Sequence, residues 1–525
     1  MLSIENTPLT EFDEQVFTIV VPENHYLRRV GAVVDFERFR ARMLDAYNPS
    51  LGRPAIDPVR MLKILFLCFH YGLSDRQVIE RTRTDMAFRW FLGMGLHVAL
   101  PNHTNGTHFR QRLGEKRFQQ IFQDIVTLAR ERGLVSDRLR LKDATHVFAD
   151  AAELQPLALA AQVREHLLRA ADPFFPDWVA TQHLHADIIS QTTAEMPDAQ
   201  RLNARVEHLE EMAKHLRQQT ASWPNSDDTP SHQRLRRMLK MVEKLLGDHA
   251  QPKAGDRLAS AVDSEGRTGL HGDYFVGYLL DVAMDAESEI ITAVNVLPAN
   301  GPEAIDAIAL IKQEEAAQSN NVEGLSMDGA GYNGPVLREL TNPEGLDVDV
   351  TVPPPKPAPR TTFGPERFPL KVLEDGYSEV TCPAGKTTRQ RERLKDKHGS
   401  RYTFKTSHCA GCPLREQCLQ KPQSKKGRTV IKNDYEAEYQ KVHQKAETPE
   451  YAATRRLHPK IERKLNELAR HHRNRRARYR GLGKVLSQSL LTALVTNVKR
   501  IVKLLDQKVN DVIGALTVRA ETEKA

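Results

Sequence analysis

The sequence predicts an α/β protein in which a mixed β-sheet is combined with separate helical and cysteine-rich parts. Residues 139–148, 274–284 and 290–297 alternate polar and apolar side chains or are rich in strand-forming residues. Much of 1–134 and 157–246 instead repeats apolar side chains at helical spacing. Four of the five cysteines fall together in one later segment.

The composition is that of a folded, soluble protein. Its 525 residues allow two to four domains, and 40% hydrophobic with 27% charged residues is ordinary for globular chains. The first 20 residues show no basic start followed by an apolar run, and no apolar stretch reaches the roughly 20 residues of a membrane span. Basic residues exceed acidic ones by only 75 to 68, so binding of a polyanion would depend on local clusters of charge.

Residues 1–134 are predicted to form a helical N-terminal domain. Asp57 before Pro58 supplies a helix N-cap, and Ser74 opens a capping box. Asp85 can cap a further helix. Short helices joined by tight turns are compatible with a helix-turn-helix DNA reader and equally with a helical packing domain.

A helical insertion is predicted to split the sheet. The first strand carries Asp143, and residues 153–255 then form the insertion, whose break at 223–230 indicates a helical hairpin. The sheet resumes with a β-hairpin, and a strand at 322–327 leads directly to Asp328. The other elements expected in this part are helices at 302–318 and 335–340 and a strand at 346–352.

The remaining segment contains a linker, the cysteines and two helices. A proline-rich linker at 352–359 leads into the cysteine region, and together they occupy residues 353–446. Residues 447–525 hold a helix bearing Glu462, a run of arginines and a final apolar helix.

Three acidic residues are placed where they could share metal ions. Cleaving or joining a phosphodiester with two divalent ions requires carboxylate oxygens that hold both ions. Asp143 lies in a strand, Asp328 at the end of another strand, and Glu462 on a helix. Acids on two strands and a packed helix are sufficient for such a site.

Short motifs around these acids follow one another through most of the chain. They are Asp143-Ala-Thr-His146 with Ala149-Asp150, Gly277-Tyr278, Met327-Asp328-Gly-Ala-Gly-Tyr332, His458-Pro-Lys-Ile-Glu462, Arg478-Tyr-Arg-Gly481 and Asn497-Val-Lys-Arg500. In this order they resemble the DDE transposases of bacterial insertion sequences. Further motifs resemble the N-terminal domain of that family, namely Val34-Asp35, Gly52-Arg-Pro54 and Phe109-Arg110-Gln-Arg112-Leu-Gly114.

The resemblance implies an RNase H-like catalytic core formed by residues 135–152 and 256–352. The helical N-terminal domain, the helical insertion and the cysteine-rich insertion would be additions to this core. The resemblance also implies that Asp143, Asp328 and Glu462 are the catalytic residues and the ligands of Mg²⁺ or Mn²⁺. Asp150 is a second acid near the first strand and ranks below Asp143, whose Asp-Ala-Thr setting is like that of the family.

Two positions on the helix of the predicted catalytic glutamate depart from the family pattern. Many relatives place an arginine four residues before the glutamate and a lysine seven residues after it, where they hold DNA phosphates. This chain has His458 and Ala469 at these places. Arg455, Arg456 and Arg470 are the residues that could substitute.

Six arginines in eleven residues follow that helix and are predicted to contact the DNA backbone. Guanidinium groups bind phosphates bidentately, and such contacts dominate affinity while reading little sequence. The six are Arg470, Arg473, Arg475, Arg476, Arg478 and Arg480.

The clustered cysteines have the spacing of a metal site. Cys409 and Cys412 form a knuckle that lets two thiolates reach one zinc ion, and Cys382 and Cys418 can complete a tetrahedral shell. The alternatives are a structural Zn²⁺ site and four reduced thiols in a small subdomain. His408 is a possible substitute ligand, and the alternative is that it is an incidental neighbour.

The predicted function is that of a transposase. It would bind the terminal inverted repeats of its element in double-stranded DNA, hydrolyse a strand and transfer the freed 3′ hydroxyl to target DNA. Because two DNA ends must meet, a homodimer on DNA is expected, in a cytoplasmic, nucleoid-associated protein. The alternatives are a metal-dependent nuclease without strand transfer, an inactive DNA-binding regulator derived from a transposase, and a helical scaffold protein.

Overall fold

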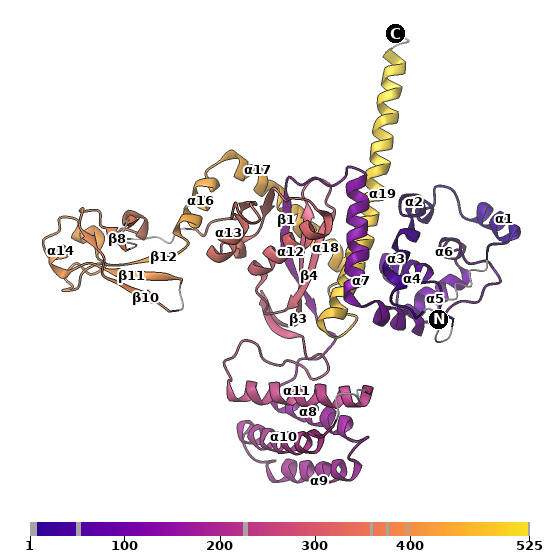
Figure 1. Ribbon diagram of the computed structural model, residues 1–525, viewed down its shortest axis with the longest axis horizontal. Helices are drawn as coiled ribbons and strands as arrows, with labels where there is room; N and C mark the ends of the chain where they lie inside the picture. The colour runs from indigo at the N-terminus through magenta and orange to yellow at the C-terminus, as the bar shows by residue number, and fades with distance from the viewer. Residues whose placement is uncertain are drawn as a thin grey trace.

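The computed structural model describes residues 8–48, 54–223, 229–356, 361–373, 377–395 and 398–522. Three predicted features lie partly outside these ranges: Gly52 and Arg53 of an N-terminal motif, the break at 223–230, and the linker at 352–359. A central sheet with helices packed beside it occupies the middle of the molecule, and three further groups of elements surround it (Figure 1).

The central sheet is mixed. Its strands are β1 (Arg140–Phe148), β2 (Arg267–His271), β3 (Asp273–Asp285), β4 (Ile291–Pro298), β5 (Gly324–Ser326) and β6 (Asp349–Thr351). Their order is β2-β3-β1-β5-β6, and β4 pairs with the edge of β3 opposite β1. β1 runs antiparallel to β3 and parallel to β5, and β5 is parallel to β6. All the predicted strands are confirmed, and β2 is an additional strand.

Alternate side chains of β3 and β4 point to the two faces of the sheet. Ala283 and Ala293 pack against Leu310 of α12 (Glu303–Gln318) on one face. Val282 and Val294 belong to the large core on the other face. The helices that share this core include α7 (Thr104–Glu131), α18 (Pro459–Arg470) and α19 (Leu482–Thr522).

The N-terminal segment is helical, as predicted. Before α7 it contains α1 (Glu11–Val20), α2 (Tyr26–Val33), α3 (Arg40–Leu44), α4 (Pro58–His70), α5 (Asp75–Thr84) and α6 (Met86–Leu92). The caps at Asp57, Ser74 and Asp85 are confirmed by bonds from backbone N–H groups to their side chains. The long helix α7 is broken at Gly114, whose φ of 65° is left-handed.

The segment between β1 and β2 forms four helices rather than a single hairpin. They are α8 (Pro156–Ala171), α9 (Pro176–Thr192), α10 (Asp198–Thr220) and α11 (Pro230–Ala250). Pro156 and Pro176 each begin a helix. Proline is tolerated there because a backbone N–H at this position would have no partner within the helix. The four helices enclose a hydrophobic core of their own, built around Leu167, Leu209 and Leu235.

The cysteine region contains two small three-stranded sheets. One consists of β7 (Leu370–Val372), β8 (Ser378–Thr381) and β9 (Thr387–Thr388), and the other of β10 (Arg391–Leu394), β11 (Gly399–Thr403) and β12 (Thr429–Asn433). α14 (Thr406–Ala410) and α15 (Arg415–Cys418) lie between β11 and β12, whereas α13 (Gly334–Leu340), α16 (Glu436–Ala446) and α17 (Pro449–Leu457) contact one another or β6 of the central sheet. Among the residues that the structure describes, no helix is long and apolar enough to span a lipid bilayer.

Candidate active site and DNA interface

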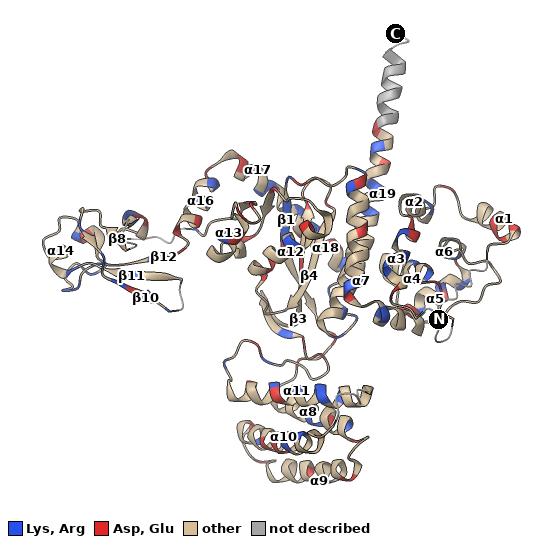
Figure 2. Cartoon of the chain, viewed as in Figure 1, with Lys and Arg blue, Asp and Glu red and all other residues tan. Residues whose placement is uncertain are grey.

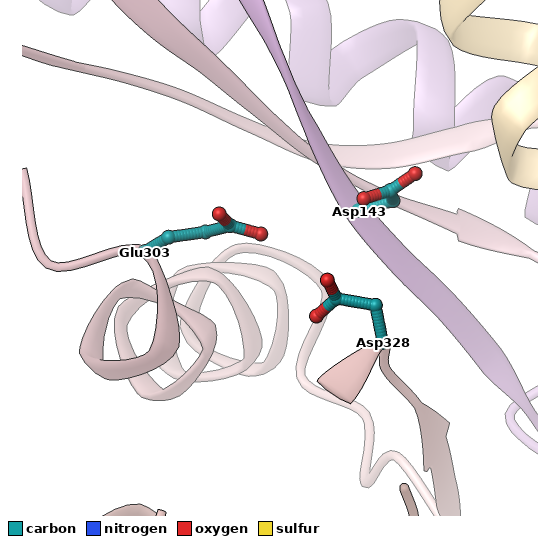
Figure 3. Close-up of side chains that lie close together, drawn as sticks. All are labelled: Asp143, Glu303 and Asp328. Atoms are coloured by element: carbon teal, nitrogen blue, oxygen red, sulfur yellow. The ribbon is translucent and has the colours of Figure 1, made fainter. Parts of the chain in front are cut away.

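Three carboxylates converge where the inner strands β1 and β5 of the central sheet separate. Asp143 lies in β1, Glu303 in the first turn of α12, and Asp328 just after β5. Each offers one oxygen, and the three oxygens lie within 4.8 Å of one another (Figure 3). Carboxylate oxygens at this spacing are the ligands that Mg²⁺ and Mn²⁺ prefer, so the donor set fits a divalent cation.

The carboxylates meet because β1 and β5 separate at this point. The two strands pair only where Arg140 and Leu141 face Leu325 and Ser326. Beyond this pairing β5 ends, and the chain turns at Asp328, whose Oδ1 accepts a bond of 3.0 Å from the Ala330 N–H. The space between the diverging strands therefore admits acidic side chains from β1, from the end of β5 and from α12.

The electrostatics of the cluster favour a bound cation. Burial raises the pKa of Asp143 to about 7, and the negative charges of Asp328 and Glu303 act in the same direction. The Ala144 N–H, which donates to Oδ1 of Asp143 at 2.8 Å, opposes this shift. A positive ion among the three carboxylates would remove the repulsion that the ionised cluster otherwise suffers.

Lys142 supports the cluster from the α12 side of the sheet. Its Nζ lies 3.2 Å from Oε1 of Glu303 and 3.1 Å from Oδ2 of Asp281. Burial disfavours the charged lysine, but these two carboxylates outweigh the burial and raise the pKa of Lys142. Glu303 is thus held between a buried ammonium group and the two aspartates.

Glu462 is not part of this cluster in the described structure. It lies in the first turn of α18 and is exposed, whereas Ile461, Leu465 and Leu468 form the buried face of the helix. α18 packs against β1, the strand of Asp143. The structure brings together Asp143 and Asp328 of the three predicted ligands, and the role of Glu462 stays a prediction.

The two departures from the family pattern, His458 and Ala469, are both buried. His458 is buried, and its Nδ1 lies 3.2 Å from the Ser326 hydroxyl. Burial and the nearby Arg455 lower the pKa of His458 to about 4. Arg455 donates to the Met327 carbonyl at 2.7 Å, directly before Asp328. Of the three possible substitutes for the missing cations, Arg455 is the one that the structure places beside the carboxylates.

The arginine run lies against the end of β1. Phe148 donates its N–H to the Arg475 carbonyl at 2.9 Å, and the Ala477 N–H donates to the Phe148 carbonyl at 2.8 Å. This short pairing places the run five residues along β1 from Asp143. Four of the six arginines are exposed and form no ion pair with any described residue, namely Arg470, Arg473, Arg475 and Arg476.

The last two arginines of the run have structural partners. Arg478 donates to the Leu73 carbonyl at 3.1 Å and lies over the Phe69 ring at 4.7 Å, which ties the run to the N-terminal helices. Arg480 bonds Asp150, which is exposed and does not join the carboxylate cluster. Both arginines line a cleft of about 1080 Å³ that α7 also borders.

Two further family-like motifs meet at the start of α19. Tyr278 donates its hydroxyl to Oδ1 of Asp263 at 2.5 Å, and the Gly481 N–H donates to the same oxygen at 3.1 Å. The preceding Gly277 packs so closely on β1 that an added Cβ would lie 2.0 Å from the Val147 carbonyl oxygen. These residues therefore fix the arginine run and α19 to the sheet.

Comparison with known families assigns two parts of this chain. Residues 15–112 match the family described as "Transposase domain (DUF772)", and residues 381–502 match "Transposase DDE domain". Both matches support a DDE transposase of insertion sequences. The first match covers helices of the N-terminal segment, and the second begins beside Cys382 and runs through α18 and the arginine run into α19.

One curated relative of this chain is a protein of Rhizobium meliloti named "Uncharacterized protein ORF8 in nfe locus". It is 27% identical over 124 residues, which cover 23% of this chain and 59% of the relative. The matched segment thus spans less than two thirds of that protein. No solved structure matches the chain.

Sequence reasoning about this transposase missed Glu303. It is an acid in the first turn of a predicted helix, a position that usually signifies only a favourable interaction with the helix dipole. Its approach to Asp143 depends on how α12 crosses the sheet, and no local pattern reports this. The helix directly follows the β-hairpin, which is the one sequence signal that could have placed it near β1.

The four predicted zinc ligands lie in one part of the cysteine region, although no three of their sulfurs form a group within 4.8 Å among the described residues. Cys382, Cys409, Cys412 and Cys418 line one small cavity in the cysteine region, together with His408. All four are free thiols.

Proposed function

We propose that this protein catalyses metal-dependent DNA strand cleavage and strand transfer of an insertion sequence. The observation that carries the proposal is the convergence of Asp143 and Asp328, with Glu303, where β1 and β5 separate. The order of the central sheet, with antiparallel strands on one side of β1 and parallel strands on the other, supports assigning it to the RNase H-like class. The transposase family matches supply the reaction type.

The proposed cofactor is Mg²⁺ or Mn²⁺, bound by Asp143 and Asp328. Two such ions supply an activated nucleophile and a stabilised leaving oxygen in phosphodiester chemistry. The third carboxylate has two candidates, Glu462 from the family pattern and Glu303 from the structure. Glu303 is already held beside the aspartates, whereas Glu462 would have to turn inward from α18.

The other residues would position the DNA. Arg455, fixed by the Met327 carbonyl, presents its remaining guanidinium donors near Asp328. The exposed part of the arginine run follows β1 away from Asp143 and would hold backbone phosphates of the terminal inverted repeat or the target. Because attack at phosphorus is in line, orientation of the strand by such contacts contributes directly to the rate. Two ends of the element must be held together, so a homodimer on DNA is proposed.

A plasmid assay tests the proposal. The intact protein and Asp328→Asn are incubated with supercoiled plasmid, DNA carrying the element ends, and Mg²⁺ or Mn²⁺. Metal-dependent joined products that the substitution abolishes are expected. Cleavage without joining would replace the proposal by a nuclease, and DNA binding with neither activity in both proteins would replace it by a regulatory protein.

The third ligand is identified by comparing Glu303→Gln with Glu462→Gln. Both substitutions keep the side-chain size and remove one charge. Loss of joined products by orders of magnitude in only one variant assigns the ligand to that residue. Loss in both variants means that both acids serve the reaction, and unchanged activity in both would contradict a three-carboxylate site. Glu265→Gln, an acid that bonds the Leu482 N–H away from the cluster, is the control for general charge effects.

A further inference from the structure

The cysteine module, residues 361–433, has a very small hydrophobic core. Five buried side chains form it, namely Phe368, Val380, Tyr402, Phe404 and Val430. A unit of this size rarely folds on so few apolar contacts without disulfides or a metal ion. Its cysteines are free thiols, so a metal ion is the stabilising group that this composition calls for.

The cavity that the four cysteines line has the volume of about one ion or water, roughly 20 Å³. Cys382 lies in the turn between β8 and β9, the knuckle of Cys409 and Cys412 follows β11, and Cys418 ends α15. The Arg428 N–H donates to Sγ of Cys409 at 3.5 Å, the kind of bond that supports a metal-bound thiolate. The sulfurs do not yet form a group of three within 4.8 Å, so binding would draw them together.

The net positive charge of the cysteine module exceeds the net charge of the complete chain. Its sequence holds 16 lysines and arginines against 7 aspartates and glutamates, a net charge of +9, whereas the complete chain is +7. The rest of the chain therefore sums to −2. Figure 2 marks lysine and arginine positions in blue on the ribbon of the module, which lies apart from the central sheet.

Three of these cations lie in the loop between α15 and β12. Lys421, Lys425 and Lys426 are exposed, and their amino groups form no ion pair or hydrogen bond with any described residue. Charges on the edge strand β10 can be explained as protection against pairing with other sheets. The loop lysines have no such role, because they are not part of a strand.

Hydrogen bonds of Arg415 connect the loop that carries the three lysines to the Cys409 knuckle. Arg415 donates to the carbonyls of Pro422 and Ser424, both at 2.6 Å, and also to the Cys409 carbonyl. Gly427 packs on the backbone just after β11, since an added Cβ would lie 2.0 Å from the Phe404 carbonyl oxygen. A metal ion that fixes the Cys409 knuckle would therefore fix the loop as well.

We propose that the cysteine module binds one Zn²⁺ through Cys382, Cys409, Cys412 and Cys418 and thereby presents Lys421, Lys425 and Lys426 to the phosphate backbone of duplex DNA. Four thiolates around one ion close a structural zinc shell, so the module holds DNA and performs no chemistry. The inference rests on the proposed function only for the identity of the polyanion as DNA.

The zinc part is tested by metal analysis of the full-length protein purified without chelator. About one zinc per chain is expected, as for a closed four-thiolate site. Cys409→Ser with Cys412→Ser should lose the zinc, and Cys68→Ala, which removes the thiol outside the module, should keep it. A wild-type protein without zinc after purification from zinc-supplemented cells would overturn the proposal.

The DNA part is tested by fluorescence anisotropy with a labelled duplex at several salt concentrations. Replacing Lys421, Lys425 and Lys426 by glutamine should lower the slope of log affinity against log salt by about 2 to 3, because each phosphate contact contributes about 0.9. The matched control replaces three exposed lysines of the helical insertion at residues 153–255, Lys214, Lys240 and Lys253, and should leave the slope unchanged. Equal slopes for the loop variant and wild type would overturn the proposed DNA contact.

The two parts are linked by a third measurement. The cysteine double variant should lose as much of the salt slope as the lysine variant, since its loop is no longer held by the knuckle. An unchanged slope without zinc would contradict the link. Asp328→Asn should keep both zinc content and slope, so failure of the plasmid assay and failure of this inference are separate results.

Discussion

The ammonium group of Lys142 lies 3.2 Å from Oε1 of Glu303, the acid that joins Asp143 and Asp328 in the carboxylate cluster. Lys142 directly precedes Asp143 in β1. Asp143 is itself a member of the cluster, and Lys142 contacts the cluster through Glu303. Lys142 is only 3% exposed and also contacts Asp281, which is fully buried. The cation thus connects the candidate metal ligands to the packing of α12 on the sheet.

Replacing Lys142 by methionine should destabilise the protein and loosen Glu303. The substitution keeps most of the apolar stem but leaves Asp281 without its buried cation, a change that typically costs about 3 to 5 kcal/mol of unfolding free energy. Urea denaturation measures it. Lys312→Met removes a cation from α12 whose pair with Glu339 is half-exposed, and should cost less than about 1 kcal/mol. Equal losses in the two variants would contradict a structural role for the Lys142 contacts.

Gly277→Ala should destabilise the protein because the new Cβ has no space. It would lie 2.0 Å from the Val147 carbonyl oxygen, which belongs to the paired backbone of β1 and cannot move freely. Overpacking of this kind costs about 1 to 3 kcal/mol or more. Gly247→Ala has the opposite expected sign. Gly247 lies inside α11 with nothing within 4 Å of an added Cβ, so alanine should stabilise by about 0.5 to 1 kcal/mol. Chemical denaturation of both variants distinguishes steric from conformational effects.

The arginine run should divide into binding and structural members. Arg470 and Arg476 are exposed, so their replacement by glutamine should lower the salt slope of DNA binding by up to about 2 and leave stability nearly unchanged. Arg478→Gln should instead lower stability by about 1 to 3 kcal/mol, because the Leu73 carbonyl and the Phe69 ring lose their partner. Anisotropy and urea denaturation on the same preparations compare the two classes. A fall in stability for the Arg470 and Arg476 variant would show that these side chains also have structural partners.

The sequence predicted the strands of the central sheet because their apolar runs are long or end at clear turns. Asp143 and Asp328 could be placed on strands for the same reason. β2 was not predicted, since Arg267, Gly269 and His271 lack the composition of a strand, and pairing with β3 decides its conformation. Propensity is a weak signal where tertiary pairing dominates.

Other features depend on contacts between distant segments. Glu303 reaches the cluster through the path of α12, and Arg478 turns inward because Leu73, some 405 positions earlier, offers a carbonyl. An arginine that binds phosphate and one that binds a buried carbonyl look alike in sequence. The break at 223–230 predicts one helical hairpin, but Pro156 and Pro176 are also helix starts, so the segment forms the four helices α8 to α11.

Acid should lower the free energy of unfolding of the four helices α8 to α11, because His208 becomes protonated. This side chain is 3% exposed on α10, and its Nε2 lies 2.9 Å from Oε1 of Gln182. Burial, with the nearby His185 and Arg164, lowers the pKa of His208 to about 4. Because the folded-state pKa is below the unfolded value of about 6.5, the unfolded chain takes up a proton first as the pH falls. The stability that the neutral ring contributes is therefore complete above pH 6.5 and is lost between pH 6.5 and about 4.

His208→Gln provides the comparison for this pH dependence. Glutamine can donate to Gln182 and has no charge to acquire, so the free energy of unfolding of the variant should fall less than that of wild type between pH 7 and pH 4.5. Urea denaturation followed by far-ultraviolet circular dichroism measures both proteins at each pH. All other titrating groups are common to the two chains, so the difference between their pH profiles isolates His208. Parallel profiles would mean that His208 is protonated in the folded protein as readily as in the unfolded chain.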